Sequence, residues 1–281
     1  VPPVPRSPRL GEQGEARAMT YRTLADFVSA HETLYATYTA WCRGFSADDL
    51  ATQSLCPDWD VRGVIAHTIG VESVLDGWDP SPESPPPFGK MGEFAAAVAD
   101  LDPPAVASKV AEVTAPRLDH LRSMDPGVVA APSITPTGVK TYGDFLRIRV
   151  FDLWVHAWDI AIPLGHSHDA GGIAAELALD EVAGAIGYIA GKQVGLPDGR
   201  SAVVHITGEV ERDIAVVVDG RARPADSVDD PDVEITADVE TFVLLAAGRI
   251  DPQSRIDDGR ITWAGDAEWG ELMARNLVYT R

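Results

Sequence analysis

The sequence predicts an all-α bundle followed by a small α+β domain with an antiparallel sheet. Up to about residue 197, apolar residues recur at steps of three and four, as they do along one face of a helix. Beyond that point they alternate at steps of two, which is the period of a strand. We therefore expect a leader at 1–18, a helical domain at 19–197 and an α+β domain at 198–281.

The composition is typical of a soluble globular protein with room for two domains. The chain has 281 residues, of which 45% are hydrophobic. Its 23 Lys and Arg against 43 Asp and Glu give a net charge of −20. This charge argues against nucleic acid or an anionic membrane as the main partner, because both attract basic surfaces. We expect a monomer or homodimer that acts on small molecules.

Targeting and redox signals favour the cytoplasm. No apolar run reaches the roughly 18 residues that a membrane-spanning helix needs. Residues 1–18 lack the apolar core of a signal peptide, so we expect a disordered leader upstream of Met19, a candidate start. The only cysteines, Cys42 and Cys56, are too few for a disulfide-stabilised secreted protein and are expected to be buried thiols.

The helical domain begins with a long amphipathic helix. Its apolar positions run from Leu24 to Phe45 at the helical step. His31 lies on this apolar face, where a lone histidine is more often a hydrogen-bonded core residue than a ligand. The next helix begins at an N-cap, for which Asp58 and Asp60 are the candidates.

The rest of the helical domain alternates between helices and loops rich in proline or glycine, which cannot continue a helix. One of these loops holds His166 and His168, which we expect to be solvated. In order, the predicted segments are a loop at 79–87, helices at 91–101 and 105–124, a loop at 125–138, a helix at 142–164, a loop at 165–172 and a helix at 173–195.

The α+β domain is predicted from alternating apolar residues and turn signals. A turn at Asp219 and Gly220 ends one strand. Asp238 caps a helix that Gly248 ends, and Asp266 caps a last helix. The predicted segments are strands at 201–208, 213–220, 232–238 and 260–265, and helices at 239–248 and 267–279.

The helix at 142–164 carries polar residues on a face that should be apolar. Asp152 and His156 lie four apart, one turn above each other, as two ligands of one metal ion would. A buried, unpartnered carboxylate costs roughly several kcal/mol, so the alternative is a salt bridge from Asp152 to Arg149 or His156. Asp159 is either an acceptor for an imidazole N–H or a residue that faces solvent.

A second histidine on another helix favours the metal site. His67 shares an apolar stripe with Val64 and Val71, so it should point inward. As a buried neutral residue it would bond a backbone carbonyl. As a ligand it would complete a set with Asp152 and His156, and three protein ligands leave the fourth position of a catalytic zinc open.

Four segments carry a resemblance to a known family. They are CPDWDVRGVIAH at 56–67, FLRIRVFDLWVHAWDI at 145–160, ETFVLLAAGRIDP at 240–252 and WAGDAEWG at 263–270. In this order and spacing, the sequence resembles the mycothiol-dependent maleylpyruvate isomerase family of actinobacteria from about Met19 onward. The resemblance implies a DinB-like four-helix bundle that binds metal, followed by a sterol-carrier-like domain.

The resemblance also implies site chemistry. A divalent metal, usually zinc, would bind His67, Asp152 and His156, and mycothiol would be the thiol cosubstrate that attacks a small electrophile. Some members have Glu where this chain has Asp152, and the shorter side chain draws the ion closer to the helix or weakens its binding. Arg249 matches a Gly-Arg motif whose arginine would bind a substrate carboxylate. Alternatively, Arg249 only caps the end of its helix.

Three functions stay open. The first is a metal-dependent thiol S-transferase or isomerase. The second is a metal-dependent hydrolase that uses zinc-bound water, and the third is a non-catalytic protein that binds a small ligand. The presence of His67, Asp152 and His156 together disfavours the third, because a protein without the chemistry would tolerate their loss. A thiol requirement separates the first function from the second.

Overall fold

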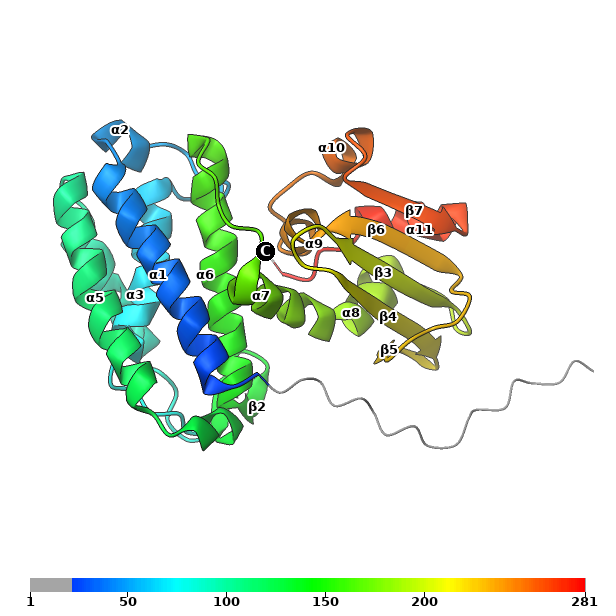
Figure 1. The fold of residues 1–281 in the computed structure, drawn as a ribbon, viewed down its shortest axis with the longest axis horizontal. Coiled ribbons are helices and arrows are strands. Elements are labelled where there is room, and N and C mark those ends of the chain that lie inside the picture. The colour runs from blue at the N-terminus through cyan, green and yellow to red at the C-terminus, as the bar shows by residue number, and fades with distance from the viewer. Residues whose placement is uncertain (1–21, 281) are drawn as a thin grey trace, which may run out of the picture.

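The computed structural model describes residues 22–280, so the predicted leader at 1–18 and the candidate start at Met19 lie outside the described residues. Helices form the first part of the fold, and a sheet with further helices forms the second (Figure 1). The four long helices contact one another, since α1 touches α5 and α6, and α3 also touches α5 and α6. They are α1 (Leu24–Gly44), α3 (Val61–Leu75), α5 (Pro103–Ser123) and α6 (Tyr142–Leu164).

Side-chain caps fix where these helices begin. Thr23 and Asp26 form a capping box at α1, and Thr141 and Asp144 form another at α6. Of the two predicted caps of α3, Asp60 is the one used, and its carboxylate accepts the Gly63 backbone N–H at 2.7 Å. These caps satisfy free backbone N–H groups of the first turn and so fix the residue at which each helix begins.

Shorter elements connect the long helices, and two predictions fail among them. The loop predicted at 125–138 instead holds a 3-10 turn and a hairpin, because Pro126 begins a turn capped by Asp125 and Gly138, at φ 105°, allows a tight reversal. The helix predicted at 173–195 is broken into three pieces. The connecting elements are α2 (Ala47–Leu50), η1 (Phe88–Lys90), α4 (Met91–Val98), η2 (Pro126–Ala130), β1 (Pro132–Thr135), β2 (Gly138–Thr141), α7 (Gly172–Gly184), α8 (Ile186–Tyr188) and η3 (Ile189–Val194).

The main sheet is mixed, so the prediction of a purely antiparallel sheet is wrong. Its order is β5-β4-β3-β6-β7, and the central pair of β3 with β6 is parallel while the other three pairs are antiparallel. The β4–β5 hairpin occupies one edge of the sheet. The chain then crosses to the other side of β3, where β6 pairs with β3 and runs parallel to it. The strands are β3 (Ser201–Thr207), β4 (Arg212–Asp219), β5 (Arg221–Ala225), β6 (Val233–Asp238) and β7 (Ile261–Gly265).

Three features of the second part were not predicted, and one of them is the short helix α10. Strand β5 lacks apolar alternation and contains Pro224, which suits only an edge strand. The last helix ends at Arg275, and the tail beyond it runs back between the two parts, where the Tyr279 backbone N–H donates to the Ala246 carbonyl (Figure 1). The helices of this part are α9 (Val239–Ala246), α10 (Pro252–Asp257) and α11 (Ala267–Arg275).

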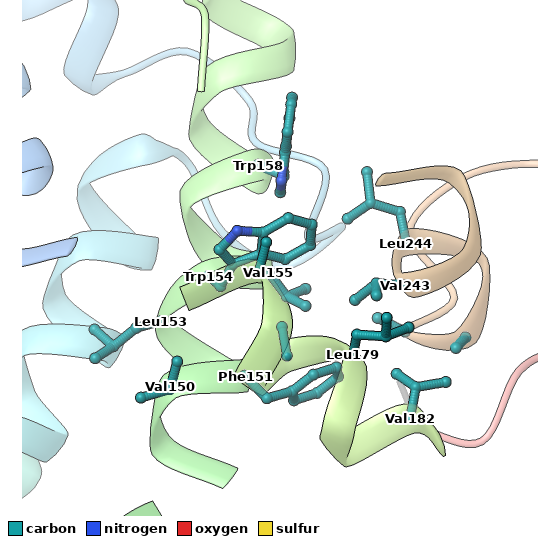
Figure 2. Packing of buried hydrophobic residues seen from close by; sticks show 14 of the residues in the cluster. Val150, Phe151, Leu153, Trp154, Val155, Trp158, Leu179, Val182, Val243 and Leu244 are labelled. Carbon is teal, nitrogen blue, oxygen red and sulfur yellow. The ribbon is translucent and has the colours of Figure 1, made fainter. Parts of the chain in front are cut away.

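An apolar contact joins helices α6 and α7 to α9 of the α+β part. Figure 2 shows Phe151 and Val155 of α6 beside Leu179 of α7, with Val243 and Leu244 of α9 facing them. All five side chains are buried, and each such burial stabilises by about 1.5–3 kcal/mol. One side of α6 is therefore covered by α7 and α9.

The boundary near residue 197 stays a prediction. Within residues 22–280, no helix combines the length and apolarity that a membrane crossing needs.

Two histidines pack into the protein away from the α3–α6 contact, and of these His31 is buried and His168 is half-buried. His31 is fully buried in α1, where its Nδ1 donates to the Phe27 carbonyl at 2.7 Å, as expected of a core histidine. The expectation that His168 is solvated is wrong, because its ring packs against Trp154 and Trp158 at centroid distances of 5.9 and 5.0 Å. Burial lowers the pKa of each of these two histidines to about 4.

Replacing His31 with glutamine should reduce the acid sensitivity of the protein. Between pH 6.5 and about pH 4, the unfolded chain binds a proton at His31 and the folded chain does not, so the free energy of unfolding falls as the pH falls. The His31 share reaches about 2–3 kcal/mol at pH 4.5. Urea unfolding at pH 7 and pH 4.5 should show a smaller loss for His31→Gln than for the wild type.

His205→Gln is the control with the opposite sign. Its hydrogen bond to Asp213 raises the pKa of His205, so this histidine stabilises the fold below its unfolded pKa and loses that contribution as the pH rises. The His205 variant should therefore lose more stability at pH 4.5 than the wild type does. Parallel pH curves for wild type and His31→Gln would contradict the prediction.

Candidate metal centre

The three predicted metal ligands meet where α3 faces α6. One ligand atom from each of His67, Asp152 and His156 lies within 4.8 Å of the other two. The His67 Nε2 is 3.9 Å from Asp152 Oδ2, and the His156 Nε2 is 3.6 Å from Asp152 Oδ1. The structure therefore brings the predicted set together from two helices that are far apart in sequence.

The chemistry of this donor set fits a divalent cation. The Nδ1 of His156 lies 2.7 Å from Asp159 Oδ2 and donates to it, so Nε2 of a neutral imidazole keeps its lone pair and faces the carboxylate of Asp152. Acceptors that face each other repel unless a cation lies between them. Tetrahedral zinc with ligand distances of about 2.0–2.2 Å holds its ligand atoms about 3.3–3.6 Å apart, close to the separations observed.

Trp59 forms an aromatic wall beside both imidazoles. Its ring stacks on His67 at a centroid distance of 4.6 Å and lies 5.9 Å from His156. Trp59 directly precedes the N-cap Asp60, so the same short segment starts α3 and places the indole. The stacking restricts the rotation of the His67 ring, which is 28% exposed and is the least buried of the three ligands.

Asp159 is a buried hub and does not face solvent. Its side chain has no exposed surface, and it accepts hydrogen bonds from three groups. These are His156 Nδ1 at 2.7 Å, the Cys56 thiol at 3.1 Å and Arg249 Nε at 3.0 Å. A carboxylate on the outer nitrogen of a ligating histidine fixes its tautomer and orientation, which is the role anticipated for Asp159.

Arg249 reaches this hub from the α+β part. Its Nε bonds Asp159, and its Nη1 donates to the Ala247 carbonyl at 2.9 Å. The helix-capping alternative is therefore realised, because Ala247 is the C-cap of α9. Nη2 has no acceptor among residues 22–280, which leaves this end of the guanidinium free for another partner.

Cys56 is a functional neighbour that sequence analysis treated only as a buried thiol. It is 7% exposed, and its Sγ lies 3.8 Å from His156 Nδ1. Burial, and next the charge of Asp159, raise the pKa of Cys56 to about 12. The thiol is therefore protonated at neutral pH and acts as a hydrogen-bond donor to Asp159. Its place in the segment just before the Asp60 cap was the only sequence signal.

The salt-bridge alternative for Asp152 is also present. Arg149 Nη1 donates to Asp152 Oδ2 at 3.0 Å. Burial is the largest single influence on the pKa of Asp152 and would raise it, but Arg149, His156 and His67 together outweigh burial and hold that pKa well below its usual range. The carboxylate is thus ionised at neutral pH and available as a ligand. Glu72, which binds the other side of Arg149, was missed because nothing in its helix sequence marks it as polar and buried.

Two family models match this chain. The mycothiol maleylpyruvate isomerase N-terminal domain matches residues 31–161, and the C-terminal domain of the same family matches residues 176–271. The chain belongs to the mycothiol maleylpyruvate isomerase family. Together the two matches cover both the helical part and the α+β part, including every residue of the candidate metal centre.

Relatives of this family differ in how much of the chain they resemble. Two uncharacterized proteins, from two strains of Mycobacterium tuberculosis, are each 28% identical over 162 residues, which is 57% of this chain and 78% of each relative. A crystal structure of the mycothiol-dependent maleylpyruvate isomerase has a TM-score of 0.54 and 18% identity, over 87% of this chain and 94% of that one. That likeness is one of fold. The DinB-like and sterol-carrier-like assignments stay predictions.

Replacing Arg249 with alanine should destabilise the protein by about 3 kcal/mol, because it removes a charged partner from a fully buried carboxylate. Urea unfolding at pH 7 measures the change. Arg223→Ala is the matched control, since its pair with Asp219 is exposed and should contribute about 1 kcal/mol or less. Equal losses in the two variants would show that Asp159 does not depend on Arg249.

Proposed function

We propose that this chain is a metal-dependent thiol S-transferase or isomerase that uses mycothiol to attack a small electrophile. The observation that supports this proposal is the set of three candidate ligands, His67, Asp152 and His156, whose ligand atoms lie within 4.8 Å of one another in a chain of this family. The family and the crystal structure with the similar fold are both named for mycothiol-dependent maleylpyruvate isomerase. The thiol and the class of reaction are assigned to this chain because it belongs to that family.

The proposed ligands have roles set by their neighbours. His67, Asp152 and His156 would hold a divalent ion, and two imidazoles with one carboxylate are a donor set that zinc takes in catalytic sites. When bound, such an ion lowers the pKa of a coordinated thiol and so provides a thiolate at neutral pH. Asp159 accepts the proton on His156 Nδ1 in a hydrogen bond and thereby leaves the lone pair of Nε2 free to bind the metal ion.

Two further residues would handle the electrophile. Trp59 excludes water from the side of the site that both imidazoles border. Arg249 would bind an anionic group of the electrophile through Nη2, while Asp159 and the Ala247 carbonyl hold the rest of the guanidinium in a fixed plane. Because Arg249 belongs to the α+β part and the ligands to the helical part, turnover would require both.

Replacing His67 with alanine should abolish stoichiometric zinc binding and thiol-dependent turnover together, because two ligands hold zinc poorly. His67 is preferred to His156 for this test, since its loss leaves no buried carboxylate without a donor. Metal content after dialysis and calorimetry with zinc are the measurements. His166→Ala is the control, because His166 is exposed and packs on Trp41 outside the site.

The thiol separates this function from its alternatives. Zinc-loaded wild type should bind mycothiol in calorimetry, and His67→Ala should not. A zinc-loaded wild type that binds no low-molecular-weight thiol but hydrolyses an ester or amide would replace the proposal with a hydrolase. Binding of a small ligand without turnover of any electrophile would indicate the non-catalytic alternative.

Replacing Arg249 with lysine tests the carboxylate role without leaving Asp159 uncompensated. Lysine keeps the positive charge but loses the planar fork that binds a carboxylate through two hydrogen bonds. The KM for an anionic electrophile should rise about tenfold or more, while zinc and thiol affinities stay unchanged. An unchanged KM for every anionic electrophile tested would remove Arg249 from substrate binding.

A further inference from the structure

Arg149 of α6 lies between two carboxylates. Its Nε and Nη2 donate to Glu72 Oε1 at 3.0 and 2.9 Å, and its Nη1 donates to Asp152 Oδ2 at 3.0 Å. All three guanidinium nitrogens are thus engaged, and the plane of the group is fixed from both sides. Asp152 is a proposed metal ligand, whereas Arg149 and Glu72 are not among the ligand set.

Glu72 is a rigid anchor for this arrangement. It is fully buried on α3, and its Oε2 accepts the Tyr35 hydroxyl at 2.6 Å and approaches Arg117 Nε at 3.5 Å. Arg117 is also fully buried and donates to the Tyr142 hydroxyl at 3.3 Å. Tyr35 lies on α1 and Arg117 on α5. The hydrogen bonds that hold Arg149 of α6 in place therefore involve residues of all four long helices.

The arrangement leaves the two oxygens of Asp152 unequal. Oδ2 accepts the hydrogen bond of Arg149 and lies 3.9 Å from His67 Nε2. Oδ1 accepts no hydrogen bond from any residue that the structure describes and faces His156 Nε2 at 3.6 Å. We propose that Glu72 and Arg149 are positioning residues that hold Asp152 as a one-oxygen ligand, through Oδ1, of the metal ion. This inference rests on the metal site of the proposed function.

Because the side chain of aspartate is short, the way in which Asp152 is held affects where the ion lies between α6 and His67. A carboxylate free to rotate could bind an ion through both oxygens and draw it toward α6, away from His67 on the facing helix α3. With Oδ2 held by Arg149, the ion is shared by three single donor atoms. That arrangement keeps a fourth position open for the thiol.

The test replaces zinc with Co2+, whose visible absorption is intense in four-coordinate sites and weaker in five-coordinate ones. Arg149→Met keeps the length of the side chain and removes every donor, so the Kd for Co2+ should weaken by about 10–100-fold. The absorption should also fall as Oδ2 enters the coordination shell. Arg147→Met is the matched control, because Arg147 on the same helix pairs with Asp144 and Glu181 outside the site.

Two more variants test the positioning role if Arg149→Met does not fold. Glu72→Gln preserves the volume of the anchor and should produce the same spectral change in smaller measure. Arg149→Lys can still reach Oδ2 and should restore most of the wild-type spectrum. Lower stability with an unchanged Co2+ spectrum and Kd in these variants would overturn the positioning role alone. A wild type that binds no Co2+ or zinc would overturn the proposed metal site as well.

Discussion

The charges buried along α6 impose the strictest constraint on this structure. A charged group away from water is tolerated only when hydrogen-bonded partners compensate it, and removing one partner costs about 3–5 kcal/mol. Arg149, Asp152 and Asp159 all face inward, and each finds a partner on another segment. The partners come from α3, from the segment before α3 and from the α+β part. Pairing these groups therefore also determines how the segments meet.

The same pairing connects the metal centre to the second half of the chain. Arg249 bonds Asp159, which bonds His156, so one continuous set of hydrogen bonds runs from the end of α9 to a proposed metal ligand. The apolar contact of α6 with α7 and α9 lies on another side of the same helix (Figure 2). One face of α6 thus contributes stability through apolar burial, while another presents ionised groups whose geometry that burial keeps constant.

Local signals predicted the parts of this structure that depend on neighbouring residues. The helical step located α1 and α6, the Asp60 cap located α3, and the spacing of Asp152 and His156 identified the ligand pair. Long-range pairings left no such trace. Glu72 lies between Val71 and Ser73, where nothing marks it as buried, and the bond from Arg249 to Asp159 spans 90 residues. The parallel pairing of β3 with β6 likewise depends on where the chain crosses the sheet, which alternation cannot reveal.

The charges at the site also bear on how it would attract anions. The surface of this protein repels anions, since its net charge is −20, so the affinity for a thiolate and an anionic electrophile must come from nearby groups. The local cluster contains three buried or half-buried arginines and three buried or half-buried carboxylates, so apart from the histidines its formal charges cancel. A divalent ion would be the uncompensated positive charge there. In the proposed function the ion would therefore attract the thiolate, whereas Nη2 of Arg249 would contact the anionic electrophile.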